Sequence, residues 1–338
     1  MTEKVEEINI GIIGVGRIGR LHARNLKYLI PGAKVLGVAD ILEESAREVA
    51  SQLEIPMAEK DYRALLDNDD IDAVVICSST DTHAQIISEA AQAGKHIFCE
   101  KPIALELDKI DQALAAVKKA GVKLQVGFNR RFDPSFKKAK ELVAKGVIGV
   151  PHLVRITSRD PEPPPINYVK VSGGIFLDMT IHDFDMARYL LGQEVVDLMA
   201  VGSCLVDPAI GEAGDIDTAI VILKYEKGAW GTIDNSRKAV YGYDQRVEIF
   251  GPEGCVTVGN PRQTEVAING PEDTRTDKPL FFFVERYQEA YLAEMQEFIK
   301  CIQEDREPPV DGLDGKVAVE MGYAAKESLI KGSFIKLQ

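Results

Sequence analysis

The sequence has little that would suit it to nucleic acid, to a membrane or to an oxidising compartment. Its net charge is −13 over 338 residues, whereas phosphate backbones and anionic lipids attract basic surfaces. Its five cysteines include no C-x-x-C pair, which disfavours both a disulfide framework and a zinc site. No run approaches the roughly 20 apolar residues of a membrane span, and the charged start MTEKVEEINIGIIG lacks the apolar core of a secretory signal. We therefore expect a cytoplasmic protein that binds neither nucleic acid nor membrane.

Strand-like and helix-like runs alternate through the first part of the chain. INIGIIG (8–14) and KVLGVAD (34–40) are short apolar runs, and each is followed by a run with helical spacing. Strict alternation of this kind is typical of a parallel sheet with helices on both faces. We therefore expect an α/β nucleotide-binding domain at 1–128.

The rhythm changes after about residue 127. A helical run at 173–192 precedes several strand-like runs with no room for long helices between them, at 195–206, 217–225, 229–234 and 245–258. Two helical runs then end the chain. This order predicts an α+β domain at 129–338 whose open sheet is largely antiparallel.

The turn after the first strand-like run reads G-x-G-x-x-G and opens a helical run. Glycines allow a tight turn and let a pyrophosphate approach the N-terminus of the helix, whose free N–H groups and dipole favour anions. Between a strand and a helix this pattern is typical of dinucleotide binding, although a glycine turn without a ligand could look the same. The cofactor-binding candidates in the turn are Gly14, Gly16, Arg17, Ile18 and Gly19.

Asp40 ends the second strand-like run, 21 residues after Gly19. A carboxylate in this position accepts hydrogen bonds from the ribose diol of NAD and repels the 2′-phosphate of NADP. Ile41 follows it, where a phosphate site would more usefully place Arg or Ser. Arg17 is the one nearby cation that could favour NADP. We therefore expect NAD as the cofactor.

Polar residues also follow two later strand-like runs, where the ligands of open α/β sheets bind. The candidates at these strand ends are Ser78, Ser79, His83, Glu100 and Lys101. The serines could line the cofactor or cap a helix. The imidazole of His83 could pack under the nicotinamide half of the cofactor or simply begin a helix.

Lys101 precedes Pro102, which disfavours the helical conformation and keeps the lysine extended. An ammonium group at the mouth of the crevice can donate to a substrate hydroxyl and stabilise a developing alkoxide. A surface lysine paired with Glu100 is the alternative, and position alone does not separate the two.

The run GGIFLDMTIHDFDMARYLLG (173–192) is mostly apolar but carries a line of polar residues. Asp178, His182, Asp185 and Tyr189 recur at steps of four, three and four, which predicts one narrow stripe on a helix. A neutral imidazole suits the acceptance of a proton from an alcohol at neutral pH. Asp178, one turn away, would stabilise the imidazolium or orient Lys101.

Two other interpretations of this stripe remain. It could be the solvated face of the helix, although it contains no Lys or Glu. A metal site that adds Asp183 is disfavoured because Asp183 points about 100° away from His182 on an α-helix. We expect no metal, and we expect Asp185 and Tyr189 to support the stripe rather than touch the substrate.

GIIGVGRIG, LGVAD, EKP, GGIFLDMTIHDFDMARYL and YGYDQRVEIFGPEG together resemble the glucose–fructose oxidoreductase and inositol dehydrogenase superfamily. The resemblance extends from about residue 8 to about residue 332, and the segment 158–190 is most similar to bacterial inositol 2-dehydrogenases. It implies a Rossmann domain beside an α+β domain whose open sheet assembles homotetramers. It also implies a catalytic trio of Lys101, Asp178 and His182.

The activity that the resemblance implies is NAD-dependent oxidation of a cyclic polyol, with myo-inositol converted to the 2-keto inosose as the first expectation. Polar side chains around the trio would bind the hydroxyls, and the further candidates are Asn129, Arg130, Asp160 and Tyr241. Arg130 could instead form a salt bridge at the domain hinge, and Tyr243 is an alternative to Tyr241. Other substrates on the same fold are other inositol isomers, free sugars and nucleotide-linked sugars. A non-catalytic NAD-sensing regulator and an NAD-dependent glycosidase are the alternatives of another class.

Overall fold

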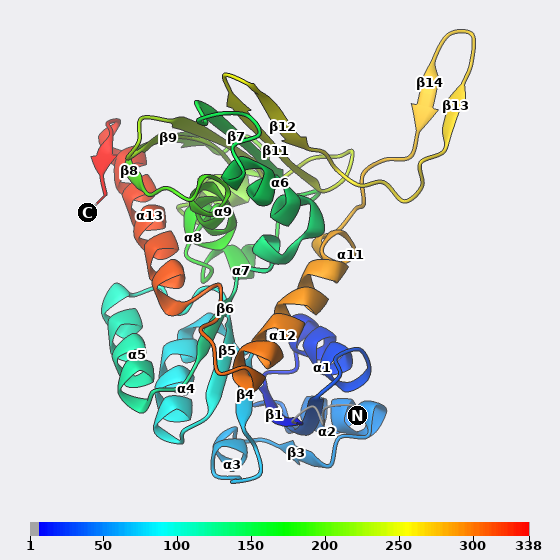
Figure 1. The fold of residues 1–338 in the computed structure, drawn as a ribbon, viewed down its shortest axis with the longest axis vertical. Coiled ribbons are helices and arrows are strands. Elements are labelled where there is room, and N and C mark those ends of the chain that lie inside the picture. Colours follow the sequence, from blue (N-terminus) through cyan, green and yellow to red (C-terminus); the bar gives the residue numbers. More distant parts are fainter. Residues whose placement is uncertain (1–6, 338) are drawn as a thin grey trace. The chain divides into compact units, whose positions relative to one another are not determined.

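The computed structural model describes residues 7–337, and the chain divides into two compact units. The first unit contains the chain up to Asn129 together with Glu289–Val317. The second contains Arg130–Gln288 and the segment that begins at Ala318 (Figure 1).

The segment Glu289–Val317 lies in the first unit because it bonds to that unit's last strand. Nε2 of Gln125 donates to the carbonyl oxygen of Glu294 over 2.8 Å, and the N–H of Val126 donates to the carbonyl oxygen of Val310 over 3.0 Å. The division expected from the sequence, after residue 128, assigns this segment to the second domain. The difference arises because a helical pattern does not reveal which sheet it packs on. The division into functional domains stays a prediction.

The first unit is built on a six-stranded sheet in which every neighbouring pair is parallel. Its strands are β1 (Ile8–Ile13), β2 (Ala33–Ala39), β3 (Met57–Glu59), β4 (Ala73–Ile76), β5 (His96–Glu100) and β6 (Leu124–Gly127). The spatial order β3-β2-β1-β4-β5-β6 is that of a doubly wound dinucleotide-binding fold. In such a sheet the ligand crevice lies at the carboxyl ends of β1 and β4, where the strand order reverses.

Helices accompany this sheet as the alternating sequence pattern predicts. They are α1 (Arg17–Tyr28), α2 (Glu43–Leu53), α3 (Arg63–Leu66), α4 (Thr80–Gln92), α5 (Leu107–Ala120) and α12 (Gln288–Gln303), and α13 (Gly312–Lys331) begins in this unit. The short elements β3 and α3 were not anticipated, because three or four residues carry too little periodicity to be recognised.

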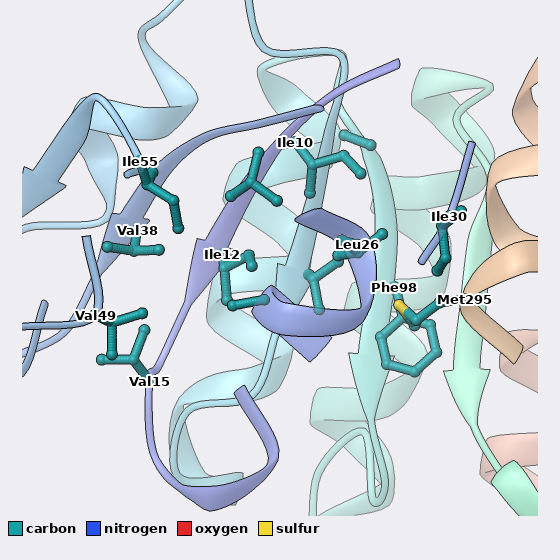
Figure 2. Packing of buried hydrophobic residues seen from close by; sticks show 14 of the residues in the cluster. Ile10, Ile12, Val15, Leu26, Ile30, Val38, Val49, Ile55, Phe98 and Met295 are labelled. Atoms are coloured by element: carbon teal, nitrogen blue, oxygen red, sulfur yellow. The ribbon is translucent and has the colours of Figure 1, made fainter. Parts of the chain in front are cut away.

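The core of the first unit joins β1 to helices on one face of the sheet. Ile10 and Ile12 of β1 are fully buried in one cluster with Leu26 of α1 and with Phe98 of β5 (Figure 2). Met295 of α12 belongs to the same cluster. Each fully buried side chain of this kind contributes about 1.5–3 kcal/mol. The packing therefore provides a rigid base for the loops that follow β1, β4 and β5.

The second unit contains a seven-stranded sheet in the order β12-β11-β7-β10-β9-β8-β15. Its strands are β7 (Leu153–Arg159), β8 (Val195–Ser203), β9 (Thr218–Tyr225), β10 (Trp230–Ser236), β11 (Asp244–Gly251), β12 (Gly254–Val258) and β15 (Ile335–Lys336). Between residues 7 and 337, only the pair β7/β10 of this sheet is parallel. The prediction of a largely antiparallel sheet is confirmed.

Two strand predictions differ in detail from the structure. The run at 245–258 is a hairpin of β11 and β12 rather than one strand. A separate hairpin of β13 (Ala267–Asn269) and β14 (Thr274–Thr276), which projects from the second unit in Figure 1, was not predicted. Each of its strands has three residues that are all exposed, so the hairpin is too short and too open to show the alternation that marks a half-buried strand.

Helices cover one face of the seven-stranded sheet. Several apolar side chains of the sheet remain exposed. The helical elements are η1 (Asn129–Phe132), α6 (Pro134–Ala144), α7 (Ile166–Val169), α8 (Ile175–Asp178), α9 (Ile181–Leu191), α10 (Pro208–Glu212), α11 (Phe283–Arg286) and the later part of α13. Tyr225 of β9 donates to the carbonyl oxygen of Ala187 in α9 over 3.2 Å. Leu153, Trp230 and Phe250 lie in register on adjacent strands and are all exposed. Across residues 7–337, the structure contains no helix with the length and apolar character that a membrane crossing needs.

Candidate active site

The glycine turn between β1 and α1 leaves no room for side chains at two of its three glycines. Gly14 has φ +87°, and a Cβ there would lie 2.6 Å from the backbone of Cys77. A Cβ on Gly19 would lie 1.9 Å from the carbonyl oxygen of Gly14. A Cβ on Gly16, in contrast, would meet nothing within 4 Å. The turn is thus tightly packed from behind, with open space at Gly16 beside the N-terminus of α1, which suits an approaching pyrophosphate.

Asp40 is held beside this turn by backbone N–H groups. Its Oδ2 accepts from the N–H of Val15 over 2.8 Å, and its Oδ1 accepts from the N–H of Leu42 over 2.9 Å. Each carboxylate oxygen has a second lone pair, so the fixed group can still accept from a ribose hydroxyl. Arg17 is exposed at the start of α1 and Ile18 is half-buried. The residues present fit NAD.

The loop after β4 is ordered by its own hydroxyl groups. Ser78 Oγ and Thr82 Oγ1 lie 2.7 Å apart, and Thr82 Oγ1 donates to the carbonyl oxygen of Ser79 over 2.7 Å. Ser79 is the residue before α4, and its side chain makes no capping hydrogen bond. Both serines thus stand at the carboxyl end of β4, where a cofactor edge would lie.

His83 links the loops that follow β4 and β5. Its ring is buried, with Nδ1 2.8 Å from the carbonyl oxygen of Pro102 and Nε2 2.9 Å from the carbonyl oxygen of Ser78. Both nitrogens therefore face the backbone. This geometry favours a role in holding together the two loops beside Lys101, and contact between His83 and the cofactor stays a prediction.

Lys101 follows Glu100, the last residue of β5, and is half-buried. The carboxylate of Glu100 points into the unit, where its Oε1 lies 3.0 Å from Nε2 of His22. Lys101 is thus presented at the carboxyl end of the sheet, while the adjacent carboxylate is engaged in the interior.

The run 173–192 forms two helices, α8 and α9, rather than the single helix that its apolar content predicts. Asp178 ends α8, and His182 is the second residue of α9. Between them the N–H of Thr180 donates to the carbonyl oxygen of Ile175, a five-residue step, over 2.9 Å. The Thr180 hydroxyl also donates to Oδ1 of Asn235 on β10 over 2.6 Å. This tertiary bond accompanies the break between α8 and α9. Asp178 therefore lies on a different helix from His182, Asp185 and Tyr189, and the four residues do not form the single helical stripe that the sequence predicts.

Asp178 belongs to a charged cluster that the sequence did not reveal. Its Oδ1 accepts from the Tyr168 hydroxyl over 2.8 Å, and its Oδ2 accepts from Nη2 of Arg237 over 3.2 Å. Nη1 of Arg237 lies 3.9 Å from Oδ2 of Asp160. Burial raises the pKa of Asp160 to about 6, with the Arg237 charge opposing it. The second unit thus gathers two carboxylates, a guanidinium and a phenol beside the α8–α9 break.

Tyr168 and Arg237 were missed for a simple reason. Tyr168 lies in INYVK, and Arg237 follows β10 in NSRKAV. Neither segment has a motif or a periodicity. The position of Arg237 just after a strand is the one signal that could have suggested it, and many surface arginines share that position.

Arg130 lies in the interior of the second unit and not in an open site. Its Nη1 lies 2.5 Å from Oδ1 of Asp183, whose Oδ2 accepts from Asn235 over 2.8 Å. Both members of the pair are buried. The sequence left open a salt bridge at the domain hinge, and the pair that Arg130 forms lies within the second unit. Contact between Arg130 and the substrate stays a prediction.

Asp185 and Tyr189 stand with Arg131 in a second internal group. Nη2 of Arg131 lies 2.6 Å from Oδ1 of Asp185, and the guanidinium carbon lies 5.3 Å from the centre of the Tyr189 ring. These contacts fix α9 against the segment before α6. They are consistent with the supporting role that the sequence suggested.

The remaining substrate candidates have mixed surroundings. Asn129 is 3% exposed, which leaves little of it for a ligand. Tyr241 is partly exposed, donates to Oδ2 of Asp244 over 2.6 Å and accepts from Nη1 of Arg159 over 3.2 Å. Contact between either residue and the substrate stays a prediction.

Comparisons with known proteins agree with this geometry. Residues 8–128 match an oxidoreductase family with an NAD-binding Rossmann fold, and residues 136–257 match the GFO/IDH/MocA C-terminal domain. The chain belongs to the GFO/IDH/MocA oxidoreductase family. Its membership confirms the resemblance seen in the sequence, the fold class and NAD as the cofactor.

Relatives within the GFO/IDH/MocA family match over nearly the whole chain. The myo-inositol 2-dehydrogenase of Thermotoga maritima is 51% identical over 98% of this chain and 99% of its own length. The structure of a myo-inositol dehydrogenase from Corynebacterium glutamicum matches with a TM-score of 0.93 at 38% identity, over 98% of this chain and 99% of that one. A scyllo-inositol dehydrogenase from Lactobacillus casei, solved with NAD(H) and scyllo-inositol, matches with a TM-score of 0.91 at 31% identity, with 98% and 99% coverage.

Proposed function

We propose that the protein oxidises myo-inositol at one ring hydroxyl to the 2-keto inosose, with NAD⁺ as the oxidant. The observation that carries this proposal is the similarity to the Thermotoga maritima myo-inositol 2-dehydrogenase over almost the full length of both chains. The polar cluster around Asp178 supports it, because a cyclitol presents only hydroxyl groups and requires hydrogen-bonding partners for each.

Lys101, Asp178 and His182 are the proposed catalytic residues. NAD⁺, when bound, supplies the acceptor for the hydride that leaves the carbon. Lys101 donates a hydrogen bond to the reacting hydroxyl, which stabilises negative charge as it develops on that oxygen. A neutral His182 takes the hydroxyl proton, a role that contributes about 10²- to 10⁴-fold to the rate.

Asp178 stabilises the imidazolium that forms on His182. Its two oxygens accept from Tyr168 and Arg237, so the carboxylate is fixed before substrate arrives. Such a preorganised charge needs little rearrangement when the proton moves. Asp160, on the other side of Arg237, is the proposed partner for a second ring hydroxyl.

The substrate assignment is tested by NADH formation with a panel of polyols and sugars. We expect myo-inositol to give the highest kcat/KM, above scyllo-inositol, chiro-inositol, glucose, xylose and nucleotide-linked sugars. A higher value for scyllo-inositol would move the assignment to that isomer, which the Lactobacillus casei relative binds. NADH formation from none of these compounds would refute the dehydrogenase proposal and favour a sensing regulator or an NAD-dependent glycosidase.

We further propose that the protein is a cytoplasmic homotetramer assembled through the seven-stranded sheet. Phe250, Leu153 and Trp230 form one exposed apolar row across three strands, and Val201 and Ile220 form another pair in register. Contiguous exposed apolar patches of this kind mark interaction surfaces. Light scattering after size-exclusion chromatography should give four times the mass of the 37.1 kDa chain, and Trp230→Glu should dissociate the assembly. A monomeric wild type would contradict the proposal.

A further inference from the structure

Three ionisable side chains meet inside the first unit, at the end of the strand that precedes Lys101. They are His22 of α1, Glu100 of β5 and Glu294 of α12. One imidazole nitrogen and one oxygen of each carboxyl group all lie within 4.8 Å of one another. Nε2 of His22 lies 3.0 Å from Oε1 of Glu100 and 3.8 Å from Oε1 of Glu294. Two carboxyl groups therefore share one imidazole.

Glu294 lies at a long ion-pair distance of 3.8 Å from His22 and accepts no hydrogen bond from the described residues that would compensate a negative charge. Its side chain is 0% exposed, and neither of its oxygens accepts a hydrogen bond from a group in the described structure. The rings of Phe98 and Tyr291 pack edge-on against His22, with centroids at 5.3 and 5.8 Å. An ionised carboxylate in such surroundings would lose its hydration and face a second carboxylate without receiving donors in return.

Among residues 7–337, the charge that acts on the pKa of Glu294 is that of Glu100, which is also negative. The buried thiol of Cys77, after β4, lies near both carboxyl groups, and the thiol of Cys99, on β5, lies near Glu100. Burial raises the pKa of Glu294 well above its ordinary range, and the nearby Glu100 charge raises it further. The pKa values of both thiols are also raised by burial, so the thiols stay neutral at physiological pH.

A metal ion is the other group that could balance two carboxylates. Structural zinc takes four ligands, and magnesium or calcium takes six or more. Between residues 7 and 337, the group contains only three candidate ligands, and two aromatic rings flank the imidazole. A proton on one carboxyl group removes the repulsion between the two and requires fewer partners than a metal ion would need.

We propose that Glu294 is a neutral carboxylic acid that shares its proton with Glu100, and that this pair, together with His22, positions the end of β5. Glu100 is the last residue of that strand and pairs with Gly127 on β6, where a Cβ would lie 2.9 Å from Oε2 of Glu100. Lys101 is the next residue along the chain. The consequence for Lys101 rests on the function proposed above, whereas the protonation of Glu294 does not.

Infrared spectroscopy of the holoenzyme tests directly whether the carboxyl group of Glu294 carries a proton. At about pH 8 an ordinary glutamate, with a pKa of about 4.3, is ionised. We expect the wild type to show a carboxylic-acid carbonyl band that Glu294→Gln removes. Glu297→Gln is the control, since Glu297 lies on the same helix but forms a partly exposed ion pair with Arg306 at 2.8 Å. A wild-type spectrum that lacks the band, or a band that Glu294→Gln leaves intact, would overturn the proposal.

Stability and metal content provide a second readout. A neutral amide can donate as the neutral acid does, so Glu294→Gln should unfold within about 2 °C of the wild type. If Glu294 were an ionised metal ligand, the wild type would contain a stoichiometric metal by elemental analysis and the variant would lose both metal and stability. That outcome would also overturn the proposal.

The positioning role is tested by kinetics. Glu294→Gln should keep kcat within about threefold, because the donated hydrogen bond is retained. Glu294→Leu removes the donor and should lower kcat roughly tenfold with little change in the KM for NAD⁺. An unchanged kcat in a folded Glu294→Leu enzyme would refute the positioning role. If Glu294→Leu does not fold, the kcat of Glu294→Gln decides, and a value far below that of the wild type would refute the positioning role. Absence of any polyol oxidation by the wild type would instead refute the proposed function, with the infrared test unaffected.

Discussion

Replacing Arg237 by methionine removes the positive charge that lies between the carboxylates of Asp178 and Asp160. The guanidinium is 1% exposed, with Nη2 3.2 Å from Oδ2 of Asp178 and Nη1 3.9 Å from Oδ2 of Asp160. Methionine keeps a flexible apolar stem of similar length. The substitution therefore isolates the electrostatic and hydrogen-bonding part of the interaction from the packing of the side chain.

The expected loss follows from distance and burial. Two unit charges 3.2 Å apart attract by about 5 kcal/mol at an effective dielectric constant of about 20. Removing one partner of a buried pair typically destabilises by about 3–5 kcal/mol. Because Asp178 and Asp160 retain 13% and 26% exposure, water recovers part of that loss. We therefore expect a decrease of about 2–3 kcal/mol in the free energy of unfolding, and a Tm lower by about 5–10 °C.

Activity should fall as well. Asp178 would keep its bond from Tyr168 but lose the one from Arg237, so its carboxylate would be held less firmly. Misplacement of a catalytic group by about 1 Å reduces rates up to about 10²-fold, and we expect kcat for myo-inositol to fall by about 10- to 100-fold.

Calorimetry and initial rates at about pH 8, where both aspartates are ionised in the unfolded chain, provide the assay. Arg155→Met is the matched control, because Arg155 pairs with Glu248 at the same distance of 3.2 Å but the two side chains are 64% and 42% exposed. A pair this open is worth at most about 1 kcal/mol. If Arg237→Met and Arg155→Met were equally stable and equally active, the assignment of Arg237 to a charged cluster that fixes Asp178 would be refuted.

Three further predictions concern pH, the glycine turn and the linked loops. Burial raises the pKa of Asp160 to about 6 in the folded protein, above its value in the unfolded chain. As the pH rises from about 4 to about 6, the free energy of unfolding of the wild type should therefore fall by about 2 kcal/mol relative to that of Asp160→Asn. A difference between the two proteins that does not change with pH in urea titrations would contradict this. Gly14→Ala should destabilise the apoprotein, because its Cβ would collide with backbone at a φ of +87°, whereas Gly16→Ala should unfold like the wild type and bind NAD⁺ less tightly; equal NAD⁺ affinity in Gly16→Ala by calorimetry would argue against the open space as the pyrophosphate site. His83→Leu should lose about 1–2 kcal/mol, since a neutral imidazole has one N–H and donates to one of the two carbonyl oxygens that its nitrogens face. A loss no larger than that of the exposed control His152→Leu would remove His83 from its linking role.

The nucleotide-binding half could be predicted almost element by element. Its strands are unbroken apolar runs because both faces of the sheet are covered, and the turn after β1 requires glycine for steric reasons that the motif itself displays. Asp40 could be predicted on the same grounds, because it directly follows β2 and accepts a hydrogen bond from the turn. Local chemistry determines each of these features, so a single sequence reveals them.

Features that depend on distant partners were not predictable. The break between α8 and α9 accompanies a bond from Thr180 to Asn235, 55 residues away. The burial of Arg130 depends on Asp183, 53 residues away. The pairing of Arg237 with Asp178 spans 59 residues. Hydrophobic periodicity carries no information about these contacts, although it identified the segment in which they occur.

A crystal structure of the unreactive complex with NADH and myo-inositol would test the central claim most directly. The account predicts that one ring hydroxyl lies about 2.6–3.2 Å from both Nζ of Lys101 and a ring nitrogen of His182. A bound cyclitol whose hydroxyls reach neither side chain, or reach each on unrelated carbons, would contradict it.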